Sequence, residues 1–141
     1  MAKFTEEQIN EIWNKGLQDP KFDSNLVRKD ACGAWMLRSR YNDRNSPFGW
    51  EIDHIYPEGK LKELNVPDNL INDIINLRPL NWNNNVSKGM DYPHYQSKMK
   101  ASKIKTSDGK ELDLNVECED EKEIKYETQQ QIEELFNGYR L

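Results

Sequence analysis

Hydrophobic residues at the start of the chain recur with the period of an α-helix. The stretch "FTEEQINEIWNKG" opens with Thr5 and Gln8, the spacing of a capping box, and Gly16 and Pro20 mark its end. The apolar residues that share one face are Ile9, Ile12, Trp13 and Leu17. The pattern predicts an opening helix that packs on the rest of the protein through this face.

The middle of the chain changes to the alternating pattern of β-strands. In "GWEIDHI", Trp50, Ile52 and His54 fall on one face, and "IINLRPL" is a second, shorter strand candidate. A long polar connection over residues 57–73 separates them. Asn81 is placed to cap a helix through "WNNNVSKG" that ends at Gly89. The predicted order is strand, loop, strand, helix.

The flanking segments are of other kinds. Residues 28–50 mix aromatic side chains with Arg38 and Arg40, and either a phosphate-binding loop or a solvated loop explains them. "IKTSDGKELDL" predicts a hairpin with a two-residue Asp-Gly turn, and "CEDEKE" an acidic, solvated segment. "TQQQIEELFNGYRL" predicts a short terminal helix. Helices and hairpins together indicate an α+β protein.

The negative charge of the chain is concentrated in its tail. The 141 residues carry a formal net charge of -5. Residues 1–99 contribute 13 Lys and Arg against 14 Asp and Glu, while residues 100–141 contribute 7 against 11. A local basic face is therefore compatible with the first part, and charge neither supports nor excludes a nucleic-acid partner. We expect one domain over residues 1–99 and an acidic extension over 100–141 that packs on it.

Two kinds of sequence feature that are absent here limit the class of protein to which the chain can belong. No apolar run approaches the ~20 residues that span a bilayer, and the first ten residues lack the apolar region of a signal peptide. Cys32 and Cys118 stand far apart with no CxxC pair, which indicates a reducing cytoplasm and removes the usual structural zinc site. These features predict a cytoplasmic protein that does not associate with membranes.

Residues able to carry chemistry gather in the middle segment. Asp53 and His54 end the first strand, Asn76 precedes the second, and Asn85 stands three residues before Lys88. Positions three apart share a helix face, so a strand end and a facing helix can bring these side chains around one point. Taken alone, an Asp-His pair is more typical of a surface contact.

The order of these residues resembles the HNH nuclease motif. "EIDHIYP…NLRPLNWNNNVSKG" carries the resemblance, with a motif core over residues 49–89. It implies a ββα-metal core, two strands and a helix around one metal ion, flanked here by an N-terminal helix and a C-terminal hairpin plus helix. The matching positions imply His54 as general base, Asn76 as support for its loop, and Asp53 and Asn85 as metal ligands. Where many members have His, this chain has Asn85.

The chemistry of such a site follows from the residue types. A histidine with an unperturbed pKa of about 6.5 accepts a proton from water near neutral pH. Carboxylate and amide oxygens are hard ligands, so the expected cofactor is one divalent ion, Mg²⁺ or else Mn²⁺. The expected substrate is nucleic acid, DNA above RNA, with phosphate contacts from Lys88, Arg78, Arg38 and Arg40. The alternatives are a catalytically weak or inactive nucleic-acid-binding module and a partner-binding protein that uses the acidic tail.

Two structural expectations accompany this hypothesis. Adjacent strand residues face opposite ways, so the strand must end or bulge for Asp53 and His54 to address one phosphate. Because CxxC pairs are absent, aromatic packing of Trp35, Trp50 and Trp82 is expected to replace the structural zinc of some members. His94, which lies outside the motif, is expected to be structural or at the surface.

Overall fold

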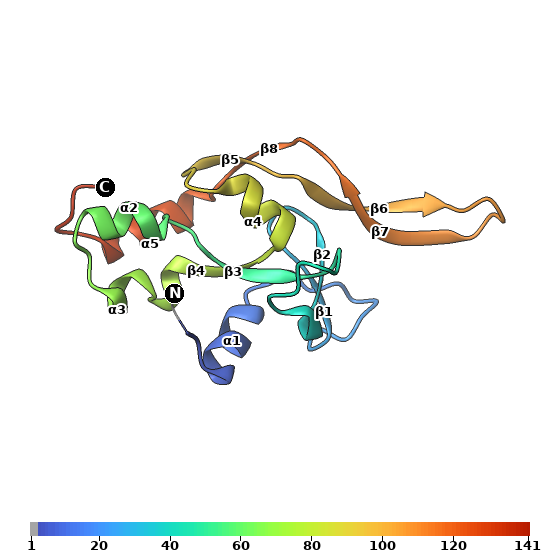
Figure 1. Ribbon diagram of the computed structural model, residues 1–141, viewed down its shortest axis with the longest axis horizontal. Helices are drawn as coiled ribbons and strands as arrows, with labels where there is room; N and C mark the ends of the chain where they lie inside the picture. Colours follow the sequence, from blue (N-terminus) through green and yellow to red (C-terminus); the bar gives the residue numbers. More distant parts are fainter. Residues whose placement is uncertain (1–2) are drawn as a thin grey trace.

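Short helices and hairpins alternate along residues 3–141, the part of the chain that the computed structural model describes, and form an α+β fold. The helices are α1 (Glu6–Trp13), α2 (Glu58–Glu63), α3 (Asp68–Ile71), α4 (Trp82–Lys88) and α5 (Tyr126–Leu135), with 3-10 turns η1 (Arg38–Arg40) and η2 (Ile74–Asn76). The strands are β1 (Val27–Lys29), β2 (Trp35–Leu37), β3 (Trp50–His54), β4 (Leu77–Asn81), β5 (His94–Gln96), β6 (Met99–Lys105), β7 (Glu111–Glu117) and β8 (Glu121–Glu123). They pair antiparallel as β1-β2, β3-β4, β5-β8 and β6-β7 (Figure 1).

The opening helix is confirmed, including its cap. The Thr5 hydroxyl accepts from the backbone N–H of Gln8 at 3.1 Å, and the Gln8 side chain accepts from the Thr5 N–H at 2.9 Å. The helix ends at Trp13, whose ring lies 5.1 Å from that of Trp50, centroid to centroid. Leu17 lies beyond the helix end and is half exposed, so it does not belong to the buried face.

The predicted strand, strand and helix of the middle segment are also confirmed. β3 and β4 pair from Trp50 with Asn81 to His54 with Leu77, and α4 follows β4 directly. The Asn81 side chain caps α4 by accepting from the N–H of Asn83 at 2.9 Å. The helix ends at Gly89, whose φ of 51° is one that side-chain-bearing residues rarely adopt. Figure 1 shows this unit in the middle of the molecule.

The approach to β3 requires a glycine. A Cβ atom added at Gly49 would lie 1.8 Å from the carbonyl oxygen of Asp43, inside the van der Waals distance. The loop before β3 therefore closes against the strand only because residue 49 has no side chain.

Two segments predicted as loops contain regular structure. The connection after β3 holds α2 and α3, whose Leu61 and Ile71 are fully buried, and residues 28–50 hold the small β1-β2 hairpin. Such short elements have weak intrinsic preference and are stabilised by the core side chains they contribute. The loop prediction was wrong because one buried residue per turn leaves little periodicity to detect.

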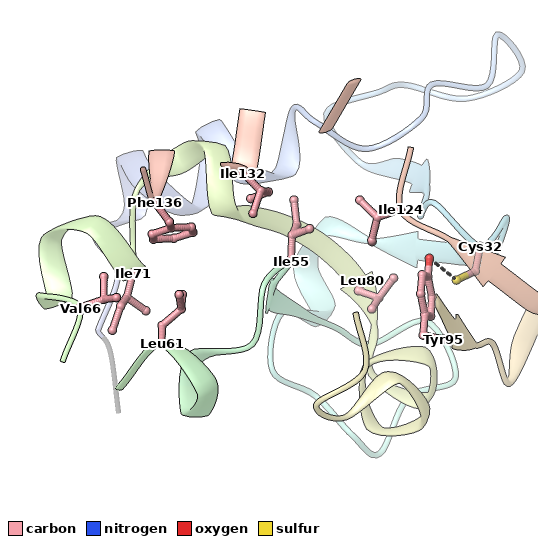
Figure 2. Packing of buried hydrophobic residues seen from close by; sticks show 10 residues of the cluster. All are labelled: Cys32, Ile55, Leu61, Val66, Ile71, Leu80, Tyr95, Ile124, Ile132 and Phe136. Carbon is pink, nitrogen blue, oxygen red and sulfur yellow. Dashed lines mark hydrogen bonds between the residues drawn. The ribbon is translucent and has the colours of Figure 1, made fainter. Parts of the chain in front are cut away.

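The tail is built into the fold rather than appended to it. β8 pairs with β5, and the main core includes Ile132 of α5 and Phe136, the residue that follows α5. Figure 2 shows both residues beside Leu61 and Ile55, from elements far apart in the sequence. Part of the segment predicted as solvated is thus strand β8. The terminal helix is confirmed.

The predicted hairpin of the tail is present, with a longer connection than expected. β6 and β7 pair over seven residues each and are joined by residues 106–110 in place of a two-residue turn. Figure 1 shows the hairpin extending away from the other elements. None of the helices within residues 3–141 has the length and apolar character needed to cross a membrane.

Candidate functional site

A polar cavity of about 500 Å³ lies beside strand β3. Its charged, imidazole and amide side chains are Asn42, Arg44, Glu51, His54, Glu58 and Asn85. Within residues 3–141, β3 pairs only with β4 along its length, apart from a single bridge at Trp50. Side chains from both faces of a strand can reach a cavity that lies along its unpaired edge. Side chains that point to opposite faces of β3 therefore line the same cavity, and the strand needs no bulge.

His54 is the last residue of β3 and is held by the segment that follows α3. Its Nε2 lies 2.7 Å from Oδ1 of Asn72, an acceptor, so Nε2 carries the ring proton. In the neutral ring, Nδ1 is then the nitrogen with a free lone pair. The Glu58 carboxylate lies 4.0 Å from Nε2. The His54 side chain is thus oriented to accept a proton at Nδ1.

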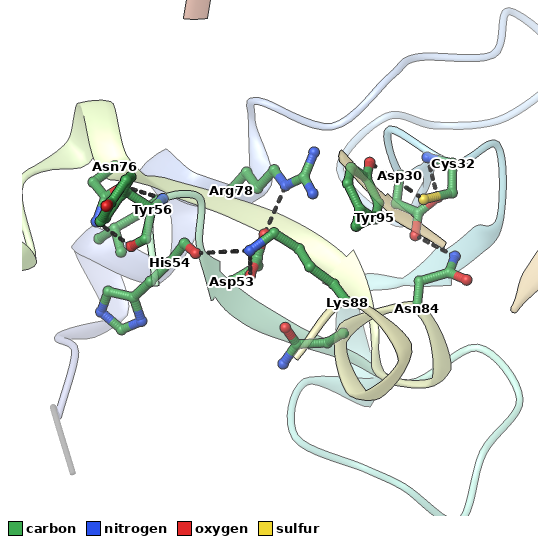
Figure 3. A network of polar contacts seen from close by, with 12 residues as sticks. Asp30, Cys32, Asp53, His54, Tyr56, Asn76, Arg78, Asn84, Lys88 and Tyr95 are labelled. Atoms are coloured by element: carbon green, nitrogen blue, oxygen red, sulfur yellow. Dashed lines mark hydrogen bonds and ion pairs between the residues drawn. The ribbon is translucent and has the colours of Figure 1, made fainter. Parts of the chain in front are cut away.

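Asn76 ties the backbone beyond His54 to the start of β4. The side chain is fully buried, and its Oδ1 accepts from the N–H of Tyr56 at 2.8 Å. Its Nδ2 donates to the carbonyl oxygens of Tyr56 at 3.2 Å and Ile71 at 3.0 Å. This amide therefore fixes the chain two residues after His54 (Figure 3).

Asp53 points away from His54 and is neutralised inside the protein. Its side chain is only 4% exposed, with Oδ2 2.8 Å from Nε of Arg78 and Oδ1 3.3 Å from Nζ of Lys88. Figure 3 shows the His54 ring turned to the other side. β3 neither ends early nor bulges, so the Asp53 carboxylate and the His54 ring leave the strand on opposite faces, although both residues, together with Asn85, line a smaller cavity of about 210 Å³.

The predicted phosphate contacts are mostly engaged within the fold. Lys88 is fully buried, and its Nζ also donates to the His54 carbonyl oxygen at 3.2 Å. Burial lowers the pKa of Lys88, and the nearby Asp53 carboxylate offsets only part of that effect. Arg38 bonds Glu6 of α1 at 2.7 Å, whereas Arg40 is about half exposed. Of the four basic residues predicted to bind phosphate, only Arg40 has a largely exposed side chain.

Glu51 is the site residue that the sequence analysis missed. Its Oε1 accepts from Nδ2 of Asn85 at 2.9 Å, and Arg44 binds the carboxylate in bidentate fashion at 2.6 and 3.0 Å. Burial raises the pKa of Glu51, but the hydrogen bonds from Arg44 and Asn85 outweigh it and lower the pKa overall. Strand alternation was the available signal, because Glu51 lies two residues before Asp53 and shares its face.

A buried carboxylate joins the segments around this unit. Asp30 has no exposed surface and accepts from the N–H groups of Cys32 at 2.9 Å, Ala34 at 2.8 Å and Asn81 at 2.9 Å. Its fourth donor is Nδ2 of Asn84, at 3.0 Å. The Asp30 network, and not the aromatic packing predicted in place of zinc, links the loop before β2 to the start of α4. The tryptophans pack separately, with Trp50 against α1.

The donor atoms for a metal ion are few. Within residues 3–141, no three or more His, Cys, Asp or Glu side chains are grouped so as to hold a metal ion. The Glu51 carboxylate and the Asn85 amide are hydrogen-bonded neighbours in the lining of the cavity, which also includes Glu58 and Asn42, and they form a hard donor pair of the type that Mg²⁺ and Mn²⁺ prefer.

Comparison with known proteins found no relative of this chain. No family model matches the chain, and no curated protein or solved structure matches it either. The arrangement of β3, β4 and α4 and its side chains is therefore the basis on which function can be argued.

Proposed function

We propose that this protein is a metal-dependent endonuclease of the HNH type that hydrolyses phosphodiester bonds of nucleic acid, with DNA as the favoured substrate. The observation that carries the proposal is the unit of β3, β4 and α4. In it His54 ends a strand, Asn76 holds the following loop, and Asn85 on the helix lines the same cavity as His54.

His54 acts as the general base in this proposal. Because Asn72 accepts the proton on Nε2, Nδ1 is free to take a proton from water. The resulting hydroxide attacks phosphorus, and the P–O3′ bond breaks to leave a 5′-phosphate and a 3′-alkoxide that gains a proton from solvent.

The residues that would hold the metal ion are Asn85 and a carboxylate. When bound, a divalent ion neutralises the scissile phosphate and stabilises the leaving oxygen. Glu51 faces the same cavity as Asn85, with the two side chains hydrogen-bonded at 2.9 Å. Asp53, the carboxylate predicted from the motif, takes this role only if it separates from Arg78 and Lys88. In either case Asn85 supplies the amide oxygen.

The alternative is a nucleic-acid-binding module without catalytic activity. It is favoured by one observation, that both nearby carboxylates are already paired with cations, Asp53 with Arg78 and Lys88 and Glu51 with Arg44. A metal ion must compete with these ion pairs. If the pairs persist, the remaining carboxylate among the described residues of the cavity is that of Glu58, which lies 3.7 Å from Nζ of Lys62.

An assay on supercoiled plasmid distinguishes the proposed nuclease from the inactive nucleic-acid-binding module. The purified protein is incubated with plasmid and Mg²⁺ or Mn²⁺, or with excess chelator, and nicked and linear forms are resolved on a gel. The proposal expects nicking with metal and none with chelator. Plasmid that is bound but stays supercoiled with every metal would support the inactive module.

A further inference from the structure

A second cavity, of about 250 Å³, lies away from His54 and is bounded by β4, β5, β8 and α5. At about 30 Å³ of liquid volume per water, it holds roughly eight waters or one small organic molecule. Its wall combines aliphatic and aromatic side chains, Leu17, Ile55, Tyr95 and Ile124, with charged ones. None of the residues given a role in the proposed hydrolysis lines this cavity.

The charged side chains of this cavity are mostly basic. Lys15, Arg78, Lys122 and Lys125 line it against one acidic residue, Glu123. The Glu123 carboxylate lies 3.4 Å from Nε2 of the exposed His94. In a chain with a net charge of -5, such a concentration of cations marks a local preference for an anion.

Arg78 places an unpaired hydrogen-bond donor at the wall of this second cavity. Its Nε binds Asp53, but its Nη2 is buried and has no hydrogen-bond partner in the structure. Figure 3 shows the guanidinium reaching past Asp53, away from His54, and its Cζ lies 5.1 Å from the centroid of the Tyr95 ring. A buried donor without a partner destabilises the protein, so a ligand oxygen that accepts from it is stabilising.

The ion pairs of Arg78 leave one positive charge unbalanced. Among residues 3–141, Asp53 is the one carboxylate within ion-pair distance of Arg78 and Lys88, and all three side chains are at most 12% exposed. Buried charges in proteins are normally paired, because an isolated one is poorly solvated. Burial is the main cause of the lowered pKa of Lys88, and repulsion by the Arg78 guanidinium adds to it.

We propose that this second cavity binds a small phosphate monoester of about mononucleotide size. The Arg78 guanidinium binds the phosphate, and the Tyr95 and Ile124 side chains contact the organic part. Lys122 adds positive charge, as does Lys15, whose Nζ also donates to the carbonyl oxygens of Ile74 and Leu77. A phosphate dianion matches several cations at once, whereas a carboxylate carries one charge and matches one guanidinium. This inference is independent of the proposed nuclease activity.

Isothermal titration calorimetry on the full chain tests the site with three probes: inorganic phosphate, adenosine monophosphate and adenosine. We expect the monophosphate to bind one per chain, and adenosine to bind at least about tenfold more weakly, since charge-assisted hydrogen bonds contribute about 1.5–3 kcal/mol. Inorganic phosphate that binds as well as the monophosphate would assign the site to the free ion and overturn the mononucleotide size. Absence of binding by all three probes at millimolar concentration would overturn the site itself.

Variants locate the binding. Arg78→Lys keeps the charge beside Asp53 but removes Nη2, and should weaken monophosphate binding by about tenfold. Thr128→Trp fills the cavity from α5 without removing a charge and should abolish binding, which keeps the test decisive if Arg78→Lys does not fold. Lys110→Gln, at an exposed residue of the β6-β7 connection, is the charge control for Lys122→Gln. Equal affinity in Lys110→Gln and Lys122→Gln, or unchanged affinity in Thr128→Trp, would overturn the proposal.

Discussion

Two histidines with different surroundings give the sharpest test at the scale of single residues. We expect His54→Ala to lower plasmid nicking by about 10²–10⁴-fold, the usual contribution of a general base. His94→Ala is the matched control, because the His94 side chain is 76% exposed on β5 and its Nε2 lies 3.4 Å from the Glu123 carboxylate. Circular dichroism checks that both variants remain folded. An active His54→Ala variant beside an inactive His94→Ala variant would move the site elsewhere.

Substitutions at Asn85 test whether this residue binds the proposed metal ion. Asn85→His offers an imidazole nitrogen, which later first-row metals prefer, so nicking should persist and shift from Mg²⁺ toward Mn²⁺, Co²⁺ or Ni²⁺. Asn85→Ala removes the amide oxygen beside Glu51 and should lose most nicking with every metal. The assay is a metal series for the wild type and both variants. Wild-type nicking by Asn85→Ala in Mg²⁺ would remove Asn85 from the site.

Glu51 predicts a pH dependence of stability. Its pKa is lowered in the folded state by Arg44 and Asn85, so its ion pairs stabilise the fold above its unfolded pKa of about 4.3 and are lost as pH falls through the lower folded value. Glu51→Gln should therefore destabilise the protein at pH 7 and have a smaller effect at acid pH. Urea unfolding at pH 7, 4.5 and 3 measures this. A difference that grows toward acid pH would contradict the assigned direction.

At the scale of elements, the Asp30 carboxylate holds the start of α4 to the loop before β2. In Asp30→Asn one oxygen becomes an NH₂ group, so one pair of donors, such as the Asn81 N–H and the Asn84 amide, loses its acceptor. Each unsatisfied buried donor costs about 1–3 kcal/mol, so we expect a loss of about 2–6 kcal/mol in the free energy of unfolding. Asp108→Asn, in the exposed β6-β7 connection, is the control and should change it by less than about 0.5 kcal/mol.

At the scale of the whole molecule, the tail is part of the core, which decides how its charge can be tested. Ile132 of α5 and Phe136, directly after the helix, are almost fully buried. Losing side chains of this kind costs about 2–5 kcal/mol each, against a total stability of about 5–15 kcal/mol. Removal of residues 115–141 should therefore unfold the protein rather than expose a basic face. Charge must be changed without truncation.

The exposed face of α5 allows the charge of the tail to be changed without truncation. Replacing Glu127, Glu133 and Glu134 by Gln removes three exposed negative charges and leaves Ile132 in the core. We expect tighter binding to nonspecific DNA at low salt, with the gain shrinking at physiological salt, where the Debye length is about 8 Å. Fluorescence anisotropy with labelled duplex at two salt concentrations measures it. Weaker binding by this variant at low salt would show that the tail makes favourable contacts with DNA.

The residues of the candidate site were only partly predictable. His54, Asn76 and Asn85 could be found because a strand end, a buried amide and a helix face are local features of "EIDHIYP" and "NWNNNVSKG". The pairing of Asp53 with Arg78 and Lys88 could not be found, because it depends on which face of β3 packs under α4. Glu51 was overlooked for the same reason. An Asp or Glu residue in a strand gives the same sequence pattern whether its carboxylate binds a metal ion, a lysine or an arginine.

The sequence by itself determined the elements whose stability is local. The capping box of α1, the amide cap and terminal glycine of α4, and the alternation of β3 all act between residues close along the chain. Only the tertiary structure decided the pairing of β5 with β8, the place of α5 in the core, and the partners of Asp30 and Asp53. Those contacts join residues tens of positions apart, and their free energy comes from burial and charge pairing that no short stretch contains.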